Sequence, residues 1–466
     1  MVRAIRNTHA PANRLPPEIL SRILEHRDDE QDLVAATHVC QYWRSVLIFD
    51  SSLWTYFGSL LSLDRTLVYL ERSKSAPIDI NVIARTPQDF DALGYLASNI
   101  ARTRSLSILT DNNVRPTLLH FCKPAPSLQH LGFDAVEGTL SIPENFLARQ
   151  APSLRSLTLI STRLEFNRFF PLPNLTVFDI YLAEGEEPFR MGALLQFFSD
   201  SPLLQKIRIN AHVEMVQDIS LDQITSLDSL VEIDYTSNQA NSILPFLRMP
   251  HLKNLLVSSS VGPGQVQGPD DILPHDGRAL LAQTTRMSHH SESDACLVRA
   301  TFSGNEVEAS FSVYYTTDED AIGGFANWFS NQTAIPLGQI EELEIGDSPG
   351  VAGFHMDAFA LENLKILRVG VWNGEFVEEI LRPFHPAPQM GVPCQSLREV
   401  EYTNCWSNDG PFPASVISLA KERKQAGYQL RVFRLVVTPE SYRNDLAEEL
   451  REHVLEVQAR ACDGRT

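Results

Sequence analysis

The organisation of this chain is set by residues 15–57, which read LPPEILSRILEHRDDEQDLVAATHVCQYWRSVLIFDSSLWTYF. The prolines predict a helix start, because a proline in the first turn lacks only an N–H that would have no partner there. Apolar residues then recur three and four positions apart, as on one face of a helix; they are Ile19, Leu20, Ile23 and Leu24. A second helical stretch, with a bend expected near His38, carries Leu33, Ala36, Val39, Cys40, Trp43, Val46 and Leu47.

About forty residues cannot bury this many large apolar side chains in a core of their own. We therefore expect part of this surface to face another chain or the next domain. The stretch resembles an F-box in the order and spacing of its motifs. These motifs are LPxEI at 15–19, Ile23-Leu24, Leu33, Val39-Cys40, Trp43 and the closing Ser52-Leu53-Trp54.

The resemblance implies docking onto a Skp-type adaptor and, through it, onto a cullin–RING ubiquitin ligase. The residues expected to contact the adaptor are Leu15, Pro16, Ile19, Leu33, Val39 and Trp43. One feature departs from the family pattern, because the family usually has an apolar residue where residues 25–30 read EHRDDE. This polar run leaves open a second interpretation, a binding scaffold whose F-box-like cap meets no ligase.

Composition narrows the possible partners. The chain has 466 residues and a formal net charge of −19, which argues against binding to nucleic acid or to an anionic membrane, since both need a positive surface. The six cysteines form no CxxC pair, as expected for reduced thiols inside a cell. The N-terminus lacks an apolar signal core, and no apolar run is long enough to span a membrane. We therefore expect a cytoplasmic or nuclear protein.

A short pattern recurs behind the F-box-like stretch: a leucine, two residues, an apolar residue, one residue and another apolar residue. Its first positions are Leu128, Leu154, Leu175, Leu204, Leu230, Leu252, Ile340, Leu364, Leu397 and Leu430. They are 21 to 33 residues apart, except for one long gap between 252 and 340. Leucine-rich repeats have this LxxLxL core and a period of about 20–29 residues.

The predicted fold class is therefore α/β: an N-terminal three-helix F-box, then an irregular leucine-rich-repeat solenoid with a parallel sheet on its concave face and helices on its convex face. This layout resembles the large fungal class of F-box proteins with divergent leucine-rich repeats. The expected parts are a disordered tail at 1–12, the F-box-like domain at 13–57, the solenoid at 58–437 and a capping helix with a tail at 438–466. The long gap predicts an insertion at about 260–335, with a hairpin formed by 296–302 and 307–314.

Strand alternation identifies the residues that point away from the core of such a sheet. They are Asp179, Tyr181, Lys206, Arg208, Glu232, Asp234, Glu342, Glu344, Arg368, Glu399, Glu401 and Arg434. We expect them to form a curved face with acidic stretches and a basic island at Lys206 and Arg208. Faces of this kind bind proteins, so this one is the candidate site for a client protein.

Motifs of an enzyme or a cofactor site are missing from the sequence. It contains no P-loop, no Gly-x-Ser-x-Gly elbow and no HExxH. His289, His290 and Cys296 lack a fourth ligand at an orderly spacing, as a structural zinc site would need. We therefore expect no enzyme activity, no metal and no nucleotide. An enzyme with a site in the 260–335 insertion remains the third interpretation.

Overall fold

The structure is a computed structural model of the chain. It describes residues 10–26, 30–58, 62–110, 118–136, 140–163, 171–182, 189–211, 213–214, 224–237, 243–261, 273–275, 281–292, 297–304, 308–315, 337–346, 357–371, 377–387, 389–404, 414–437 and 440–461. The chain divides into two compact units, one formed by 1–187 with 193–204 and the other by 188–192 with 205–466. Most of the predicted tail at 1–12 lies outside the described residues, but Pro11–Arg14 forms a 3-10 turn, η1.

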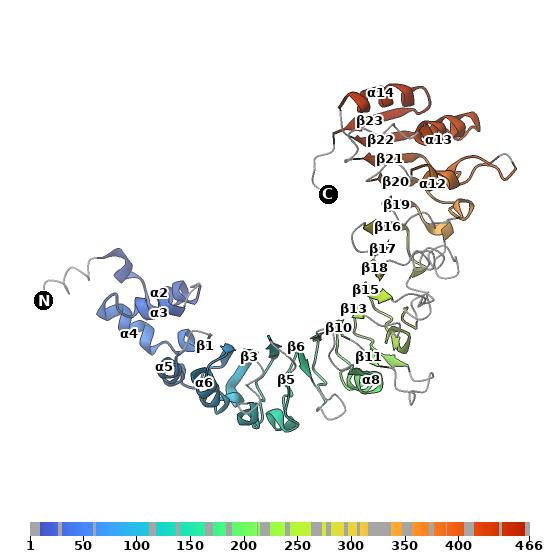
Figure 1. The fold of residues 1–466 in the computed structure, drawn as a ribbon. Coiled ribbons are helices and arrows are strands. Elements are labelled where there is room, and N and C mark those ends of the chain that lie inside the picture. The colour runs from blue at the N-terminus through green and yellow to red at the C-terminus, as the bar shows by residue number, and fades with distance from the viewer. Residues whose placement is uncertain are drawn as a thin grey trace. The chain divides into compact units, whose positions relative to one another are not determined.

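Short helices open the first unit, as the sequence predicts (Figure 1). They are α2 (Pro17–Glu25), α3 (Glu30–Ala36) and α4 (Gln41–Phe49), followed by the 3-10 turn η2 (Ser51–Trp54). The expected bend near His38 separates α3 from α4. Cys40 caps α4, because its Sγ accepts a hydrogen bond from the Trp43 N–H at 3.5 Å. The expected boundary at 57 lies inside the first compact unit, which also contains the first repeats.

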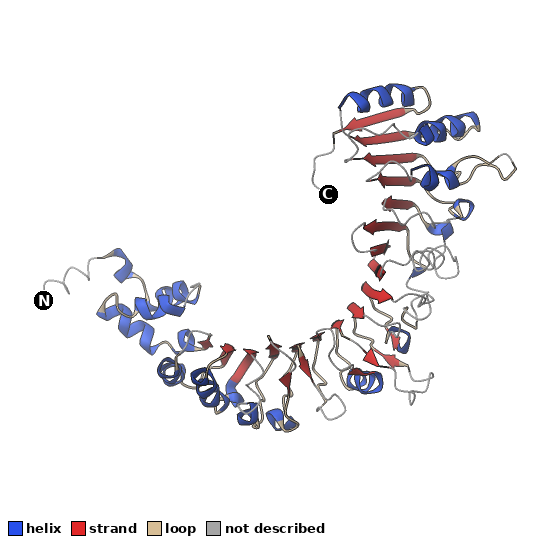
Figure 2. Cartoon of the chain, viewed as in Figure 1, coloured by secondary structure: helices blue, strands red, loops and turns tan. Residues whose placement is uncertain are grey.

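The rest of the first unit is a parallel sheet. Its neighbouring strands, in order, are β1 (Tyr56–Phe57), β2 (Ile78–Ala84), β3 (Thr103–Thr110), β4 (His130–Ala135), β6 (Ser156–Ile160) and β8 (Val177–Tyr181). Helices α5 (Leu63–Ser73) and α6 (Pro87–Ala97) lie on one side of these strands (Figure 2). Thr86 starts α6 with a capping box, in which its side chain and that of Asp89 bind each other's backbone N–H.

The second unit continues the same scheme of neighbouring strands. Its strand order is β10 (Lys206–Asn210), β13 (Glu232–Ser237), β15 (Asn254–Val261), β18 (Glu308–Tyr315), β17 (Leu297–Ser303), β16 (Arg286–Glu292), β19 (Glu342–Gly346), β20 (Ile366–Val371), β21 (Glu399–Asn404), β22 (Val432–Val437) and β23 (Glu456–Arg460). All described neighbours in it run parallel, except that β17 is antiparallel to both β16 and β18. Helices α12 (Val377–Leu381) and α13 (Ala414–Gln425) lie on one side (Figure 2).

Shorter elements connect these strands. The short strand pairs are β5 (Leu140–Ser141) with β7 (Thr162–Arg163), β9 (Phe189–Arg190) with β11 (Val213–Glu214), and β12 (Thr225–Ser226) with β14 (Leu247–Arg248). The 3-10 turns are η3 (Ile100–Arg102), η5 (Leu119–Phe121), η6 (Phe146–Arg149), η8 (Leu244–Phe246), η9 (Leu337–Gln339), η11 (Ala358–Ala360) and η13 (Arg382–Phe384). The remaining helices are α8 (Met191–Ser199) and α14 (Glu440–Arg451).

Each of the ten predicted LxxLxL units contributes a strand to a sheet. The unit at Leu154 shows why, since Leu154, Leu157 and Leu159 are all fully buried or nearly so. The first leucine packs beneath the strand, and the next two apolar positions point into the core by strand alternation. Because the neighbouring strand places its own apolar residues in the same register, each unit buries its side chains against the next.

The insertion contains one strand more than the sequence predicts. The expected hairpin is present as β17 and β18, but β16 precedes it and pairs with β19. Because β18 also pairs with β15, the three strands join the sheet rather than leave it. Gly304 ends β17 where a Cβ would lie 2.5 Å from the carbonyl oxygen of Gln283, which only glycine tolerates. Much of 260–335 lies outside the described residues.

The C-terminal end corrects one prediction. Gly427 follows α13 with a φ of +87°, as expected for a left-handed helix C-terminus. The predicted capping helix is present as α14, but within the segment expected to be a tail, Glu456–Arg460 forms β23. The backbone explains the difference, because β22 offers hydrogen-bonding groups along its edge and β23 pairs with them in parallel register. A strand is therefore the last described element of the second unit, and α14 lies before it in the chain.

Candidate protein-interaction surfaces

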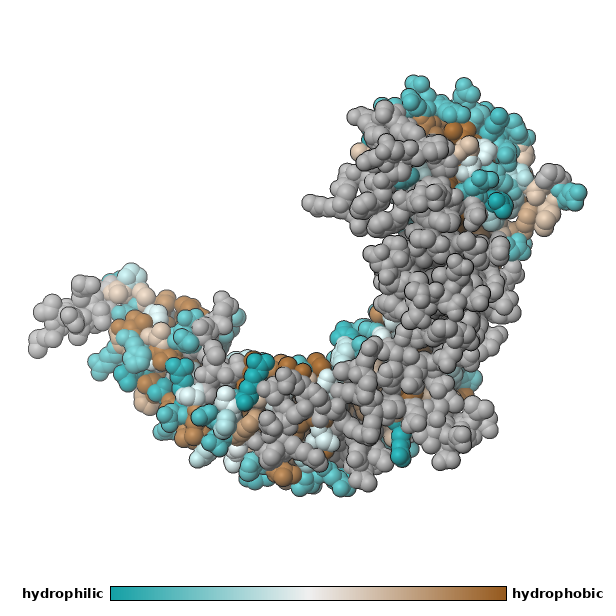
Figure 3. Space-filling view, in the orientation of Figure 1, coloured by the Kyte–Doolittle hydropathy of each residue, from teal (hydrophilic) through white to brown (hydrophobic). Residues whose placement is uncertain are grey.

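The N-terminal helices expose large apolar side chains. Ile19 and Ile23 lie one turn apart on α2 and are 43% and 52% exposed. Val39, before α4, is 57% exposed, and Phe49, at the end of α4, is 73% exposed. Figure 3 shows hydrophobic residues at the surface over these helices. The excess of apolar surface expected from the sequence is therefore exposed rather than covered by the described part of the chain.

The predicted adaptor-binding residues separate into two groups. Pro16, Ile19 and Val39 are exposed, and Leu15 and Trp43 are half-buried, so all five present surface to a partner. Leu33 does not, because it is completely buried. Its expected contact with an adaptor stays a prediction, but in this structure the buried side chain of α3 packs within the helical unit and offers no surface. Sequence spacing alone could not tell which side of α3 faces inward.

A second set of contacts holds the segment before α2 in place. The Tyr42 hydroxyl donates a hydrogen bond of 2.6 Å to the carbonyl oxygen of Leu15. The Cys40 Sγ–H donates to the Asn13 Oδ1 at 3.5 Å. These contacts join α4 to the LPxEI motif across 27 residues and position Leu15 and Pro16 at the surface. Tyr42 carries no part of the predicted motif, so its positioning role appears only in the structure.

The helices also share a core with the segment that follows them. Trp54 is fully buried, and its Nε1–H donates to the Leu47 carbonyl oxygen at 2.8 Å. Its ring meets Tyr69 of α5 edge-on at 4.8 Å, and the Arg72 guanidinium lies 4.2 Å above it. The closing Trp of the motif therefore anchors the N-terminal helices to α5, and the exposed surface lies on a supported scaffold.

Asp50 completes this scaffold at the end of α4. Burial alone would raise its pKa, but hydrogen bonds from Ser21 and Ser52 and the charge of Lys74 bring the pKa of Asp50 below its ordinary value. The carboxylate also starts η2, because its Oδ1 accepts the Ser52 N–H at 3.1 Å. The ionised form of Asp50 is thus the one that the folded structure stabilises.

Comparison with known proteins identifies this segment. Residues 12–58 match the F-box-like family. A search of curated proteins gave no significant match to the chain. The F-box-like domain indicates a role in protein–protein interaction, and a Skp-type adaptor is the typical partner of such a domain. Among the helices that the structure describes, none is both long and apolar enough to cross a membrane.

The predicted client-binding residues belong to both units. Asp179 and Tyr181 lie on β8 of the first unit, and all the others lie on strands of the second. In the second unit, strand register places opposite charges side by side. Glu401 of β21 is opposite Arg368 of β20 on one side and Arg434 of β22 on the other. Alternation along the strands therefore brings the predicted residues Arg368, Glu401 and Arg434 of the second unit to one sheet face.

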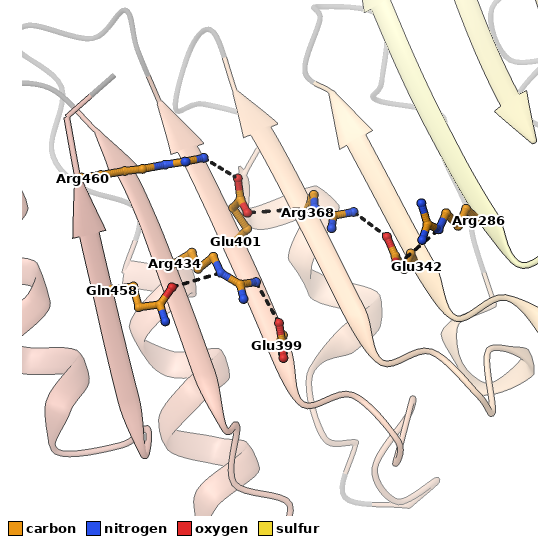
Figure 4. Close-up of polar contacts among 8 residues, drawn as sticks. All are labelled: Arg286, Glu342, Arg368, Glu399, Glu401, Arg434, Gln458 and Arg460. Carbon is orange, nitrogen blue, oxygen red and sulfur yellow. Dashed lines mark hydrogen bonds and ion pairs between the residues drawn. The ribbon is translucent and has the colours of Figure 1, made fainter. Parts of the chain in front are cut away.

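The charges on this face pair with one another (Figure 4). Glu342 accepts from Arg368 at 2.9 Å and lies 3.4 Å from Arg286. Glu401 lies 4.0 Å from Arg368 and 3.5 Å from Arg460. In a separate set of contacts on the same face, Arg434 donates to Glu399 at 2.8 Å and to the Gln458 Oε1 at 3.2 Å. The result is a continuous ladder of ion pairs from β16 to β23.

The expected basic island is compensated as well. Lys206 of β10 pairs with Glu232 of β13 at 2.5 Å, and Arg208 lies 3.9 Å from the same carboxylate. The island is therefore not a free patch of positive charge, because register places an acid of the next strand against it. Exposed pairs of this kind contribute about 0–1 kcal/mol each. Their main effect is to compensate the positive charge of this part of the face, and their contribution to stability is small.

Sequence reasoning missed three members of the ladder, Arg286, Gln458 and Arg460. They lie on β16 and β23, the strands of the ladder that lack an LxxLxL unit. Without that pattern no signal marked these segments as strands, so alternation could not be applied to them. The histidines considered as metal ligands, His289 and His290, are consecutive residues of β16, and Cys296 lies outside the described residues. No cluster of three metal-ligating residues occurs in the described ranges.

Proposed function

We propose that this protein is the substrate-recognition subunit of an SCF-type cullin–RING ubiquitin ligase. Its F-box-like helices dock a Skp-type adaptor, and its repeats form a leucine-rich-repeat solenoid whose sheet face holds a client protein. The main support is the exposure of Ile19, Ile23 and Val39 within the segment that matches the F-box-like family. Exposed apolar residues of this size, grouped on one small domain, are typical of a protein-binding surface.

The proposed mechanism is proximity. The receptor performs no covalent chemistry and needs no metal or nucleotide; it raises the concentration of the client near a ubiquitin-loaded conjugating enzyme. The shared core of Trp54 and Tyr69 supports this role, because a rigid junction between docking helices and repeats limits the positions that the client can take. Such a receptor works in the cytoplasm or nucleus, where the ligase is found.

Binding to a purified Skp-type adaptor tests the proposal. We expect micromolar or tighter affinity by isothermal titration calorimetry with the full chain. Ile19→Asp should weaken it by at least about tenfold, since it places a charge in an apolar contact. Met390→Asp is the matched control, because Met390 is exposed on the second unit and the change should leave adaptor affinity unaltered. Absence of micromolar binding would end the ligase proposal.

The motif itself offers a stricter version of this experiment. The double substitution Leu15→Asp with Pro16→Ala should abolish adaptor binding and leave the repeats folded, because neither residue belongs to the Trp54 core. Circular dichroism and the thermal midpoint monitor the fold. If the folded double variant binds the adaptor with unchanged affinity, the docking surface has been placed wrongly.

The polar run at 25–30 favours one alternative, a non-ligase scaffold with an F-box-like cap. Glu25 and His26 are exposed at the end of α2, and residues 27–29 lie outside the described residues. A charged segment beside the docking helices costs binding energy unless the partner supplies complementary charges. The calorimetric experiment separates the two functions, since a scaffold without a ligase leaves the adaptor unbound.

A further inference from the structure

The sheet face of the first unit differs from the ion-pair ladder of the second. Across its strands, register aligns one row of side chains near the strand ends. The row consists of Ile83, Leu109, Asp134, Ile160 and Tyr181. Ile83 is 39% exposed and the other members are half-exposed. In the space-filling view, hydrophobic residues reach the surface along these strands (Figure 3). The row is therefore apolar on both sides of a single carboxylate.

Asp134 is the unusual member of this row. Among the described residues its carboxylate makes no hydrogen bond or ion pair. The acids of the ion-pair ladder in the second unit differ from Asp134, since Glu342, Glu399 and Glu401 each contact an arginine. The nearest members of the row on the neighbouring strands are Leu109 and Ile160, which supply no positive charge. Asp134 is thus an uncompensated negative charge held between apolar side chains.

The residue beside Asp134 on this face is a glycine, Gly132. Gly132 precedes Asp134 by two residues on the same face of β4, between Ser107 and Thr158 of the neighbouring strands. A Cβ at Gly132 would lie 3.4 Å from the Ser107 Oγ, and Gly132 itself is half-exposed. Because Gly132 is half-exposed and has no side chain, it places only backbone beside this flank of Asp134. A long side chain from a partner can lie over Gly132 and reach the carboxylate.

We infer that the first-unit face binds a client segment in which one lysine or arginine lies between apolar residues. This inference rests on the proposed function, because it names the chemistry of the client on the repeat face. The apolar row contacts the flanking residues, and Asp134 pairs with the basic group. The row spans four strand spacings, or about 19 Å, which matches about six residues of extended chain.

Charge complementarity explains why the segment must be basic at its centre. A neutral or acidic segment would cover the Asp134 carboxylate and leave it without water or a partner, which is strongly unfavourable. A cation placed there pairs with it in a partly desolvated site, where the attraction exceeds that of an exposed pair. The formal net charge of −19 acts in the same direction, since it attracts basic partners over a longer range.

A displayed library of random twelve-residue peptides is the probe for this site, selected against the full chain. We expect enriched peptides to carry one basic residue flanked by apolar ones. Asp134→Asn, which keeps the shape of the side chain, should weaken a synthetic enriched peptide about tenfold. Ile83→Ser should weaken it as well. Leu256→Ser is the matched control, because Leu256 has the same 39% exposure on β15 of the second unit.

Charge exchange makes the experiment decisive. Asp134→Lys should reject the selected peptide and bind its counterpart in which the basic residue is replaced by glutamate. The inference is overturned if no peptide is enriched, if enriched peptides lack the basic residue, or if Leu256→Ser weakens binding as much as Ile83→Ser does. Adaptor affinity is measured on the same variants. If the unaltered chain binds the adaptor but no such peptide, only this inference is refuted. If the unaltered chain binds neither the adaptor nor a peptide, the proposed function is refuted as well.

Discussion

Arg423 allows a quantitative prediction about the second unit. Its side chain is completely buried on α13. Its guanidinium donates to the carbonyl oxygens of Cys394 at 2.8 Å, Pro393 at 3.0 Å and Phe384 at 3.4 Å. The Nε–H has no partner among the described residues. Burial lowers the pKa of Arg423, which reflects the cost of holding its charge in the interior. The side chain fastens the 384–394 segment to α13.

Replacing Arg423 by methionine keeps the apolar stem and removes the donors. The two short hydrogen bonds are charge-assisted and contribute about 1.5–3 kcal/mol each, while the long one adds little. Relief of the buried charge offsets about half of this sum. We therefore expect Arg423→Met to lower the free energy of unfolding by about 1.5–3 kcal/mol. Cys394 should then lose its left-handed conformation, with a φ of +46°, since Arg423 holds its carbonyl.

Urea denaturation monitored by circular dichroism measures this loss, and hydrogen exchange of 384–394 locates it. Lys421→Met is the matched control, because Lys421 is exposed on the same helix and its replacement should alter stability by less than about 0.5 kcal/mol. A similar small change for Arg423→Met would refute the reasoning. It would mean that the buried charge costs as much as its three carbonyl contacts return.

Other predictions follow from single contacts. Tyr42→Phe removes the hydrogen bond to Leu15 and should weaken adaptor binding about threefold to tenfold in calorimetry, since a typical bond contributes about 1 kcal/mol; unchanged affinity would contradict the positioning role. Burial raises the pKa of the Cys394 thiol to about 12, so iodoacetamide at pH 8.5 should leave Cys394 unlabelled until urea unfolds the chain, and rapid native labelling detected by mass spectrometry would be inconsistent with this pKa. Because the pKa of Asp50 is lowered, its contribution to stability is present above the ordinary carboxyl pKa of about 4 and disappears as the pH falls through the lower folded value. The thermal midpoint of Asp50→Asn should therefore decline less between pH 5 and pH 2 than that of the unaltered chain, and equal declines would exclude this role.

The strands that carry an LxxLxL unit were predictable because local pattern and burial agree there. Leu157 and Leu159 alternate with half-exposed residues, and alternation of that kind needs no knowledge of the neighbouring strand. The helical segment was predictable for the same reason, since Ile19, Leu20 and Ile23 recur with the helical period. Its assignment to the F-box-like family rests on motif order within one short stretch.

The candidate sites were predictable only in part. Alternation identified which residues reach a sheet face, such as Glu342 and Arg434, but not that they pair with Arg286 and Glu399. Pairing depends on which strand lies alongside and in what register, and β16 reaches β19 only because β17 reverses direction between β16 and β18. Exposure is also a property of the assembled unit, which is why the sequence could not show that Leu33 is buried.

The sequence by itself determined the repeating strand units, the helix periods and the F-box-like motif, because each depends on residues close together in the chain. Only the tertiary structure decided that Leu33 faces inward, that β23 pairs with β22, and that the charges of the ladder pair with one another. The physical reason is that burial and ion pairing depend on distances between segments far apart in the chain. Asp134 illustrates both levels: its direction follows from local alternation, and its lack of a counter-charge follows from the strands on either side.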